Sequence, residues 1–185
     1  MALIEGIRKI RVTAELVDGS ADGSAVAVES DMIQSMDIAP AYIDGAEIIQ
    51  RGGDVIKAVV KEDDTFLGVN LTLNLAAVEV AVKVLMVGGT VVDTKWEAPK
   101  DDTEMPYPYR LEVWQANFTE SESESTQDGF IKHEFAFCKR GRLGSRSAAQ
   151  QAFSNEQYTV EARTNESNPS DIEGAWTHDE VADIV

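Results

Sequence analysis

One stretch of the sequence, residues 69–89, changes its hydrophobic period from that of a strand to that of a helix without an interruption. Apolar and polar residues alternate over 69–73, and this period of two predicts a strand with one buried face. Nearly every residue over 75–87 is apolar, which predicts a helix. A helix that is apolar on most sides is expected to bury more than one face, and a neighbouring subunit is a natural second partner. The stretch therefore indicates architecture rather than catalysis.

The sequence also predicts the ends and the exposed side of this helix. Glu79 and Lys83 are its only charges, and their i, i+4 spacing with the acid first favours a helical ion pair. We expect these two side chains to mark the exposed stripe of the helix. Asn74 is suited to cap the N-terminus, and Gly88 with Gly89 supplies a stop at the C-terminus.

Composition excludes several classes of function. The chain of 185 residues has a formal net charge of −17. A surface this acidic repels nucleic acid and anionic membranes, so we expect no specific DNA or RNA binding and no membrane association. The single cysteine excludes an internal disulfide. The N-terminus lacks the apolar core of a signal peptide, and the longest apolar stretch is too short and too charged to span a membrane. We therefore expect a soluble protein that is made in the cytoplasm.

Strand patterns predict the rest of the fold. Further strands, each with apolar residues in a strand pattern between turn-forming segments, are predicted over 6–16, 46–50, 54–61, 109–119, 130–138 and 157–163. The expected fold is mainly β with one α-helix, a β-sandwich or small barrel flanked by the helix. Closing the sheet completely, or extending it through neighbouring subunits, would protect its edges. We place this domain at 1–164 and an acidic, partly flexible tail at 165–185.

The search for catalytic or metal-binding residues finds no convincing set. His133 lies in a strand pattern and His178 in the acidic tail, and neither has a ligand-type residue four positions away. Cys138 stands next to basic residues that would lower the pKa of a thiol, but no motif of a nucleophile surrounds it. Residues 18–24 loosely resemble a calcium loop without its distal glutamate. We expect no enzyme activity, no cofactor and no metal.

The order of these elements resembles that of the major tail tube proteins of long-tailed bacteriophages. Two passages carry the resemblance, FLGVNLTLNLAAVEVAVKVLMVGGTV and FAFCKRGRLGSRSAAQQAFSNEQYTVEART, and in outline it extends over about 4–164. The type VI secretion tube protein shares the plan of this family. The acidic tail after Asn165 departs from the pattern.

The resemblance implies a structural virion protein without enzyme activity. Subunits of such proteins form hexameric rings, and the rings stack into a hollow tube through which DNA and the tape-measure protein pass. The implied partners are further copies of the chain and the tape-measure, tail terminator and baseplate proteins, with DNA only in transit. The implied location is the virion tail, assembled in the host cytoplasm. Two alternatives remain open: another virion accessory protein, such as a head decoration or neck protein, and a monomeric carbohydrate- or calcium-binding module.

Two sets of residues are expected to serve such an assembly. Residues on polar strand faces are expected near the lumen: Lys57, Glu62, Asn70 and Thr72. Residues of the basic turn and the helix are expected to contact other subunits: Lys139, Arg140, Arg142, Arg146, Glu79 and Lys83. The basic segment 131–163 follows an acidic one, 101–130, which allows complementary contacts between copies. The alternative is two solvated regions of opposite sign.

Overall fold

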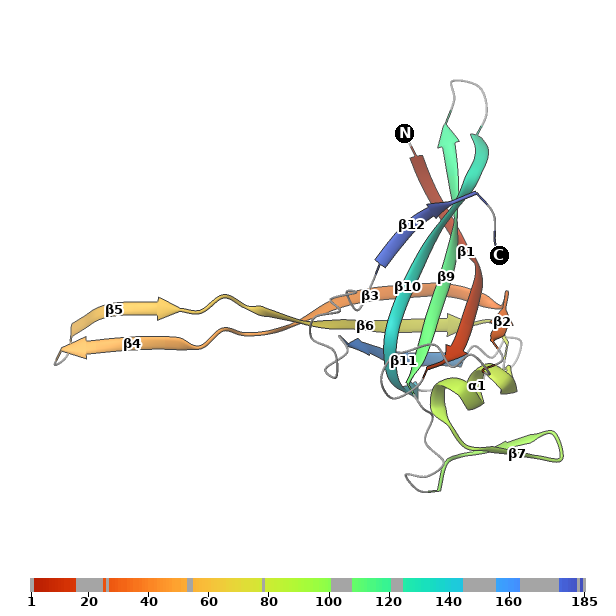
Figure 1. Cartoon of the computed structure of the whole chain (residues 1–185), viewed down its shortest axis with the longest axis horizontal. Coiled ribbons are helices and arrows are strands. Elements are labelled where there is room, and N and C mark those ends of the chain that lie inside the picture. The colour runs from red at the N-terminus through yellow and green to blue at the C-terminus, as the bar shows by residue number, and fades with distance from the viewer. Residues whose placement is uncertain are drawn as a thin grey trace, which may run out of the picture.

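The chain forms a mainly β structure with one short helix (Figure 1). The computed structural model describes residues 2–15, 25, 27–52, 55–77, 79–100, 108–120, 125–144, 156–163, 177–182 and 184. Strands of the large sheet are β1 (Ala2–Ala14), β2 (Val28–Ser30), β3 (Ile33–Ile43), β6 (Thr65–Leu75), β9 (Tyr109–Glu120), β10 (Ser125–Leu143), β11 (Glu156–Arg163) and β12 (Thr177–Val181). Their order is β2-β1-β9-β10-β11-β6-β3, every pairing is antiparallel, and β12 pairs with β10.

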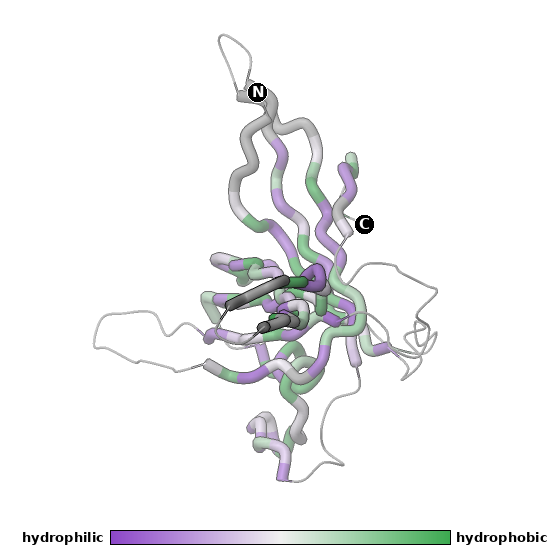
Figure 2. Tube along the Cα trace, turned by 90° about the vertical axis from the view of Figure 1, so that its left-hand side faces the viewer, coloured by the Kyte–Doolittle hydropathy of each residue, from purple (hydrophilic) through white to green (hydrophobic). Residues whose placement is uncertain are grey.

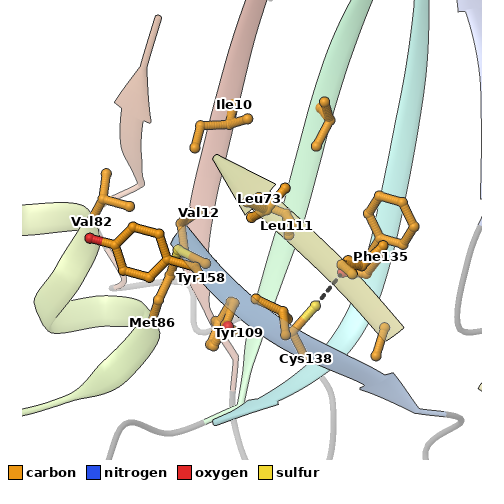
Figure 3. Packing of buried hydrophobic residues seen from close by; sticks show 14 of the residues in the cluster. Ile10, Val12, Leu73, Val82, Met86, Tyr109, Leu111, Phe135, Cys138 and Tyr158 are labelled. Carbon is orange, nitrogen blue, oxygen red and sulfur yellow. Dashed lines mark hydrogen bonds between the residues drawn. The ribbon is translucent and has the colours of Figure 1, made fainter. Parts of the chain in front are cut away.

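The long strand β10 connects the two halves of this sheet. Its first part pairs with β9 and β12, whereas its last part, from Cys138 onward, pairs with β11. The register with β9 shifts between Phe135 and Cys138, and Phe137 has a φ of 50°. A bulge of this kind bends a strand, and here it turns the sheet so that β11 and β6 cross β1 and β9. The two halves of the sheet therefore face one another across the core (Figure 3).

The core follows from the alternation of apolar residues along these strands. In β6, Val69, Leu71, Leu73 and Leu75 are all fully buried, as the period of two predicts. The other strands contribute buried residues that include Ile10, Val12, Tyr109, Leu111, Val113, Phe135, Tyr158, Val160 and Ala162. Burial of each such side chain favours folding by about 1.5–3 kcal/mol, so this one cluster is the main source of stability.

The single helix α1 (Val80–Val87) closes one end of the core and is shorter than predicted. Val82 and Met86 lie in the core (Figure 3). Gly88 ends the helix as predicted, with a φ of 89° and an N–H that donates to the Val84 carbonyl. The prediction that Asn74 caps the helix is wrong, because β6 continues to Leu75 and Asn74 keeps its extended backbone in the sheet.

Two hairpins extend from this body. After α1, β7 (Thr90–Val92) and β8 (Lys95–Glu97) form a short one. The other consists of β4 (Glu47–Gly52) and β5 (Val55–Lys61), which continue β3 and β6 far beyond the core (Figure 1). We call residues 42–66 the arm. The strands predicted over the arm are confirmed, but nothing in the sequence predicted that they stand away from the body.

The acidic segment after residue 164 also contributes to the sheet. Its strand β12 pairs with residues 130–134 of β10, and this strand was not predicted. All the predicted strands are present, within a few residues of the expected ends.

Candidate functional site

The described residues do not assemble a metal or catalytic cluster. Within the described ranges, no group of three or more His, Cys, Asp and Glu side chains is placed to hold a metal ion. His133 is largely buried, and its Nε2 lies 2.7 Å from the Gln115 side-chain oxygen. This contact accounts for a polar ring in a strand. His178 pairs with His133 in the register of β12 and β10, and its side chain lies outside what the structure describes.

Cys138 is a core residue rather than a reactive thiol. Its side chain is fully buried, and Sγ donates to the Phe135 carbonyl oxygen at 3.4 Å (Figure 3). Burial raises the pKa of the thiol far above its ordinary value, and the nearby carboxylate of Glu15 raises it further. The idea that adjacent basic residues lower this pKa is wrong, because desolvation outweighs them.

Lys83 lies inside the protein and not on an exposed stripe. Its residue exposure is 7%, and its ammonium donates to Glu156 Oε1 of β11 at 2.8 Å. Tyr158 donates a short hydrogen bond to the same carboxylate, and the Lys83 ammonium lies 4.3 Å from the centre of the Trp96 ring. The prediction that Lys83 marks an exposed stripe is therefore wrong: its charge holds α1 to β11 within one chain. Its contact with another subunit stays a prediction. Glu79 stands at the start of α1, where its carbonyl accepts from the Lys83 N–H.

A small pocket borders this ion pair. It is lined by Lys83, Leu143, Gly144, Glu156 and Gln157 and holds about 100 Å³. Pockets that bind organic ligands usually hold about 300 Å³ or more. This pocket therefore does not indicate a substrate site.

The arm combines length with exposed apolar side chains. Val59 and Val60 are 53% and 59% exposed, and since neighbours in a strand point to opposite sides, both faces of the arm are apolar there. Tyr42 and Phe66 are 60% and 40% exposed at the base of the arm, where their rings meet edge to face. Exposed large apolar residues of the arm are Tyr42, Ile43, Ile49, Val59, Val60 and Phe66.

A projecting arm of this kind is unfavourable in a protein that remains monomeric. A two-stranded hairpin is marginally stable in water, and an extended strand edge invites pairing with another chain. A contiguous exposed apolar surface marks an interaction site. In the sequence, Ile48-Ile49 and Val59-Val60 break the alternation that a half-buried strand requires, but such apolar pairs equally fit a strand that is buried on both faces.

The outer face of β3, β6 and β11 is mostly polar. Rows of facing residues cross the three strands, and one row is Ser35, Asn74 and Gln157. The Asn74 amide donates to Ser35 Oγ at 2.8 Å, and the Gln157 amide donates to Asn74 Oδ1 at 3.3 Å. Asn70 and Thr72 belong to the same face; Glu161 lies opposite Asn70, and the Arg163 guanidinium, from the next row, donates to Asn70 Oδ1. These rows make a smooth polar surface beside the base of the arm.

A compact network of charges covers the other half of the sheet. The buried Trp114 lies beneath Lys9, Arg11 and Lys132, whose cationic groups are 5.2–5.7 Å from its ring centre. Burial disfavours the charge of Lys132, but its hydrogen bonds to Glu112 and Glu134 outweigh burial and raise its pKa.

The predicted lumen residues fall into two places. Asn70 and Thr72 share one polar face of the body, whereas Glu62 lies in the arm and is exposed. Lys57 also belongs to the arm strand β5, and its side chain lies outside what the structure describes. The four lumen predictions therefore do not form one cluster.

The predicted basic contacts lie along the last part of β10. Lys139 and Arg142 are exposed there, facing solvent in this single chain. The side chain of Arg140 and the whole of Arg146 lie outside the described residues. Nothing in the structure tests whether these four contact another subunit.

No protein-family model matches the chain, and no curated protein is similar enough in sequence to be a relative. Within the described ranges, no helix has the length and apolar character that crossing a membrane requires.

Proposed function

We propose that this chain is a structural virion protein that polymerises into stacked hexameric rings, the hollow tail tube through which phage DNA passes. The observation that carries the proposal is the arm, because its apolar residues are exposed on both faces in the single chain. In an assembly the arm lies on a neighbouring copy, which buries this apolar surface and supports the hairpin.

The polar face of β3, β6 and β11 suits a lumen. Ser35, Asn74 and Gln157 are uncharged and already bonded to one another, so they offer passing DNA few unsatisfied groups. The net charge of −17 repels phosphate, and an acidic wall prevents DNA from adhering during transit. Asn70 and Thr72 then face the channel, as the sequence suggested, while Glu62 belongs to the arm and its contacts.

The remaining parts of the proposal follow from this role. The protein acts without catalysis or cofactor, in the virion tail after assembly in the host cytoplasm. Its partners are further copies of itself and the tape-measure, tail terminator and baseplate proteins. The exposed residues Lys139 and Arg142 contact acidic groups of a neighbouring subunit or ring.

Electron microscopy of the purified, concentrated protein tests the proposal. The expected result is rings or hollow filaments of uniform width. An arm-deleted variant makes the test specific: residues 44–64 are replaced by Asn-Gly, which joins Ile43 to Thr65 by a two-residue turn at a point where these residues already pair. No residue of the core cluster is removed, so the variant is expected to fold and to remain monomeric.

Point variants test whether assembly depends on the apolar side chains of the arm and not only on its backbone. Val59→Thr with Val60→Thr keeps β-propensity but removes apolar surface, and we expect it to shift assembly to higher protein concentration. Lys61→Thr, an already exposed polar position on the same strand, is the matched control and should leave assembly unchanged. Assembly of the arm-deleted variant at the wild-type concentration would refute the role of the arm.

The two alternatives predict other outcomes. Isolated rings or spikes without filaments would identify a head decoration or neck protein. A monomer that persists at high concentration and binds calcium or a carbohydrate would identify a binding module. Either result would overturn the tube.

A further inference from the structure

Parts of four strands form the end of the sheet that lies away from α1: the first part of β1, the last part of β9, the first part of β10, and β12 (Figure 1). They run in the order β1-β9-β10-β12. The outer edge of β1 pairs with β2 only at Ile10–Val12, and over residues 2–9 no described strand pairs with it. At the opposite side, β12 pairs with β10 alone among the described strands. This part of the sheet therefore has two open edges.

The strand β12 is poorly explained by the stability of a single chain. It contributes no residue to the core cluster, and Thr177, Asp179 and Glu180 are exposed. Yet β10 accommodates it specifically. Gly129 has a φ of 102°, and a Cβ at this position would lie 2.7 Å from the Val181 carbonyl oxygen of β12. A glycine at such a point permits the close approach of another backbone.

The directions of the strands determine how copies can join. Each of the three pairings is antiparallel, so β1 runs parallel to β10, and β12 runs opposite to β1. A second copy related by rotation about an axis along the strands would place its β1 beside β12 of the first copy, in antiparallel orientation. Without β12 the meeting edges would be β1 and β10, which are parallel. Because β12 makes the number of strands even, the antiparallel pattern continues from copy to copy.

The charges of the two edges are complementary. Asp179 and Glu180 on β12 and Arg8 on β1 are exposed, and none of them forms an ion pair with another described residue. The register through β9 and β10 aligns Asp179 with Lys9 and Glu180 with Ile7. Arg8 lies at the bulge between these two rows. A neighbouring copy that is not shifted along the strands therefore brings its Arg8 level with both acids.

We propose that β12 of one copy pairs with β1 of the next copy in a heterologous, antiparallel joint, with Arg8 at the level of Asp179 and Glu180. The partner at each edge is a second copy of this chain, because the edge of β1 carries an exposed positive charge and the edge of β12 carries exposed negative charges. A heterologous joint repeated by rotation closes into a ring. The joint rests on the proposed function only in assuming self-association, and it specifies which edges meet.

Crosslinking between two single-cysteine additions tests the joint. Arg8→Cys and Glu180→Cys are made in separate chains, and the native Cys138 is buried and does not compete. A short bis-maleimide should yield covalent dimers from the mixture of the two variants and none from either variant alone. Dimers from Arg8→Cys alone, or from Glu180→Cys alone, would indicate a two-fold joint and overturn the proposal. Arg8→Cys mixed with Asp37→Cys, an exposed position on β3, is the control without expected dimers.

Two further variants test whether the crosslink and the assembly require β12 to pair with β10. Gly129→Ala displaces β12 from β10, and a chain that ends at residue 176 lacks it, so both should lose the crosslink and the assembly. Gly68 also combines a positive φ with a close backbone contact, but it lies at the pairing of β6 and β11 away from both edges, so Gly68→Ala is the matched control for backbone strain. Wild-type assembly by the chain that ends at residue 176 would refute the joint.

The results separate this joint from the tube proposal. Hollow filaments without the mixed crosslink would refute the joint and leave the tube. The mixed crosslink in closed rings that never stack would support the joint and refute the tube.

Discussion

The buried ion pair between Lys83 and Glu156 allows the sharpest test of the fold. The two side chains are 9% and 3% exposed, and 2.8 Å separates Nζ from Oε1. We consider Lys83→Met, which keeps an unbranched chain of similar length but leaves the carboxylate without its cation. The exposed pair of Lys61 and Asp64, with side chains 57% and 44% exposed and 3.4 Å apart, is the matched control.

The geometry gives the expected magnitude. At 2.8 Å and an effective dielectric constant of about 20, the Coulomb attraction is about 6 kcal/mol before desolvation is subtracted. Removing one partner of a buried pair costs about 3–5 kcal/mol, because the remaining charge stays buried without compensation. We therefore expect Lys83→Met to lower the free energy of unfolding by about 3–5 kcal/mol. Lys61→Met should lower it by less than about 1 kcal/mol, because solvent screens an exposed pair.

Urea unfolding at a protein concentration below assembly measures both values. The double variant Lys83→Met with Glu156→Gln removes the unpaired charge and should recover most of the loss, which distinguishes a charge effect from poor packing. The reasoning would be refuted if Lys83→Met cost no more than Lys61→Met. It would also be refuted if the double variant were less stable than the sum of the two single losses.

Three other predictions concern a thiol, a glycine and a surface carboxylate. Cys138 should resist alkylation at pH 8.5 in the folded protein and react at once in urea, because burial raises its pKa; mass spectrometry reads the modified fraction. Gly68→Ala should lower the unfolding free energy by at least about 2 kcal/mol in urea, because φ is 149° and the new Cβ would lie 2.2 Å from the Ala162 carbonyl oxygen. The pKa of Glu29 is lowered by hydrogen bonds from Lys9 and Arg11, so its stabilising effect is complete above its unfolded pKa and disappears as pH falls through the lower folded value. Glu29→Gln should therefore flatten the acid limb of a stability-against-pH curve: its small loss of stability is complete at pH 7, where solvent screens this exposed group, and vanishes below the folded pKa.

The alternation of apolar residues predicted the core strands well. Leu71 and Leu73 are buried in β6 as expected, because a strand with one polar and one apolar side has a single favourable orientation toward a core. The helix was also predictable as an element, and Gly88 ends it. Its beginning was not, because pairing of Leu75 with neighbouring strands on both sides extends the sheet into residues with high helix propensity.

The candidate site was less predictable, because local spacing does not say which face of an element is covered. Glu79 and Lys83 have the spacing of a surface pair, yet the partner of Lys83 is Glu156, which lies 73 positions away in the sequence. The exposure of the arm also depends on which other elements pack against it, and local sequence does not specify this. Val59 and Val60 are residues of a type that is common in buried strands. They are exposed to solvent only because of how the elements are arranged.

The sequence by itself determined most of the strands, the single helix and the acidic surface, because each of these depends on residue type and short-range periodicity. The tertiary structure alone decided that the arm projects from the body, that Lys83 is buried and that β12 adds a strand beside β10. These three features depend on contacts between residues far apart in the chain, where the bend in β10 and the crossing of β6 and β11 over β1 and β9 bring them together or hold them apart. Figure 2, with the arm directed toward the viewer, shows the resulting division: hydrophobic segments gather in the body, and hydrophilic and hydrophobic residues alternate along the strands that leave it.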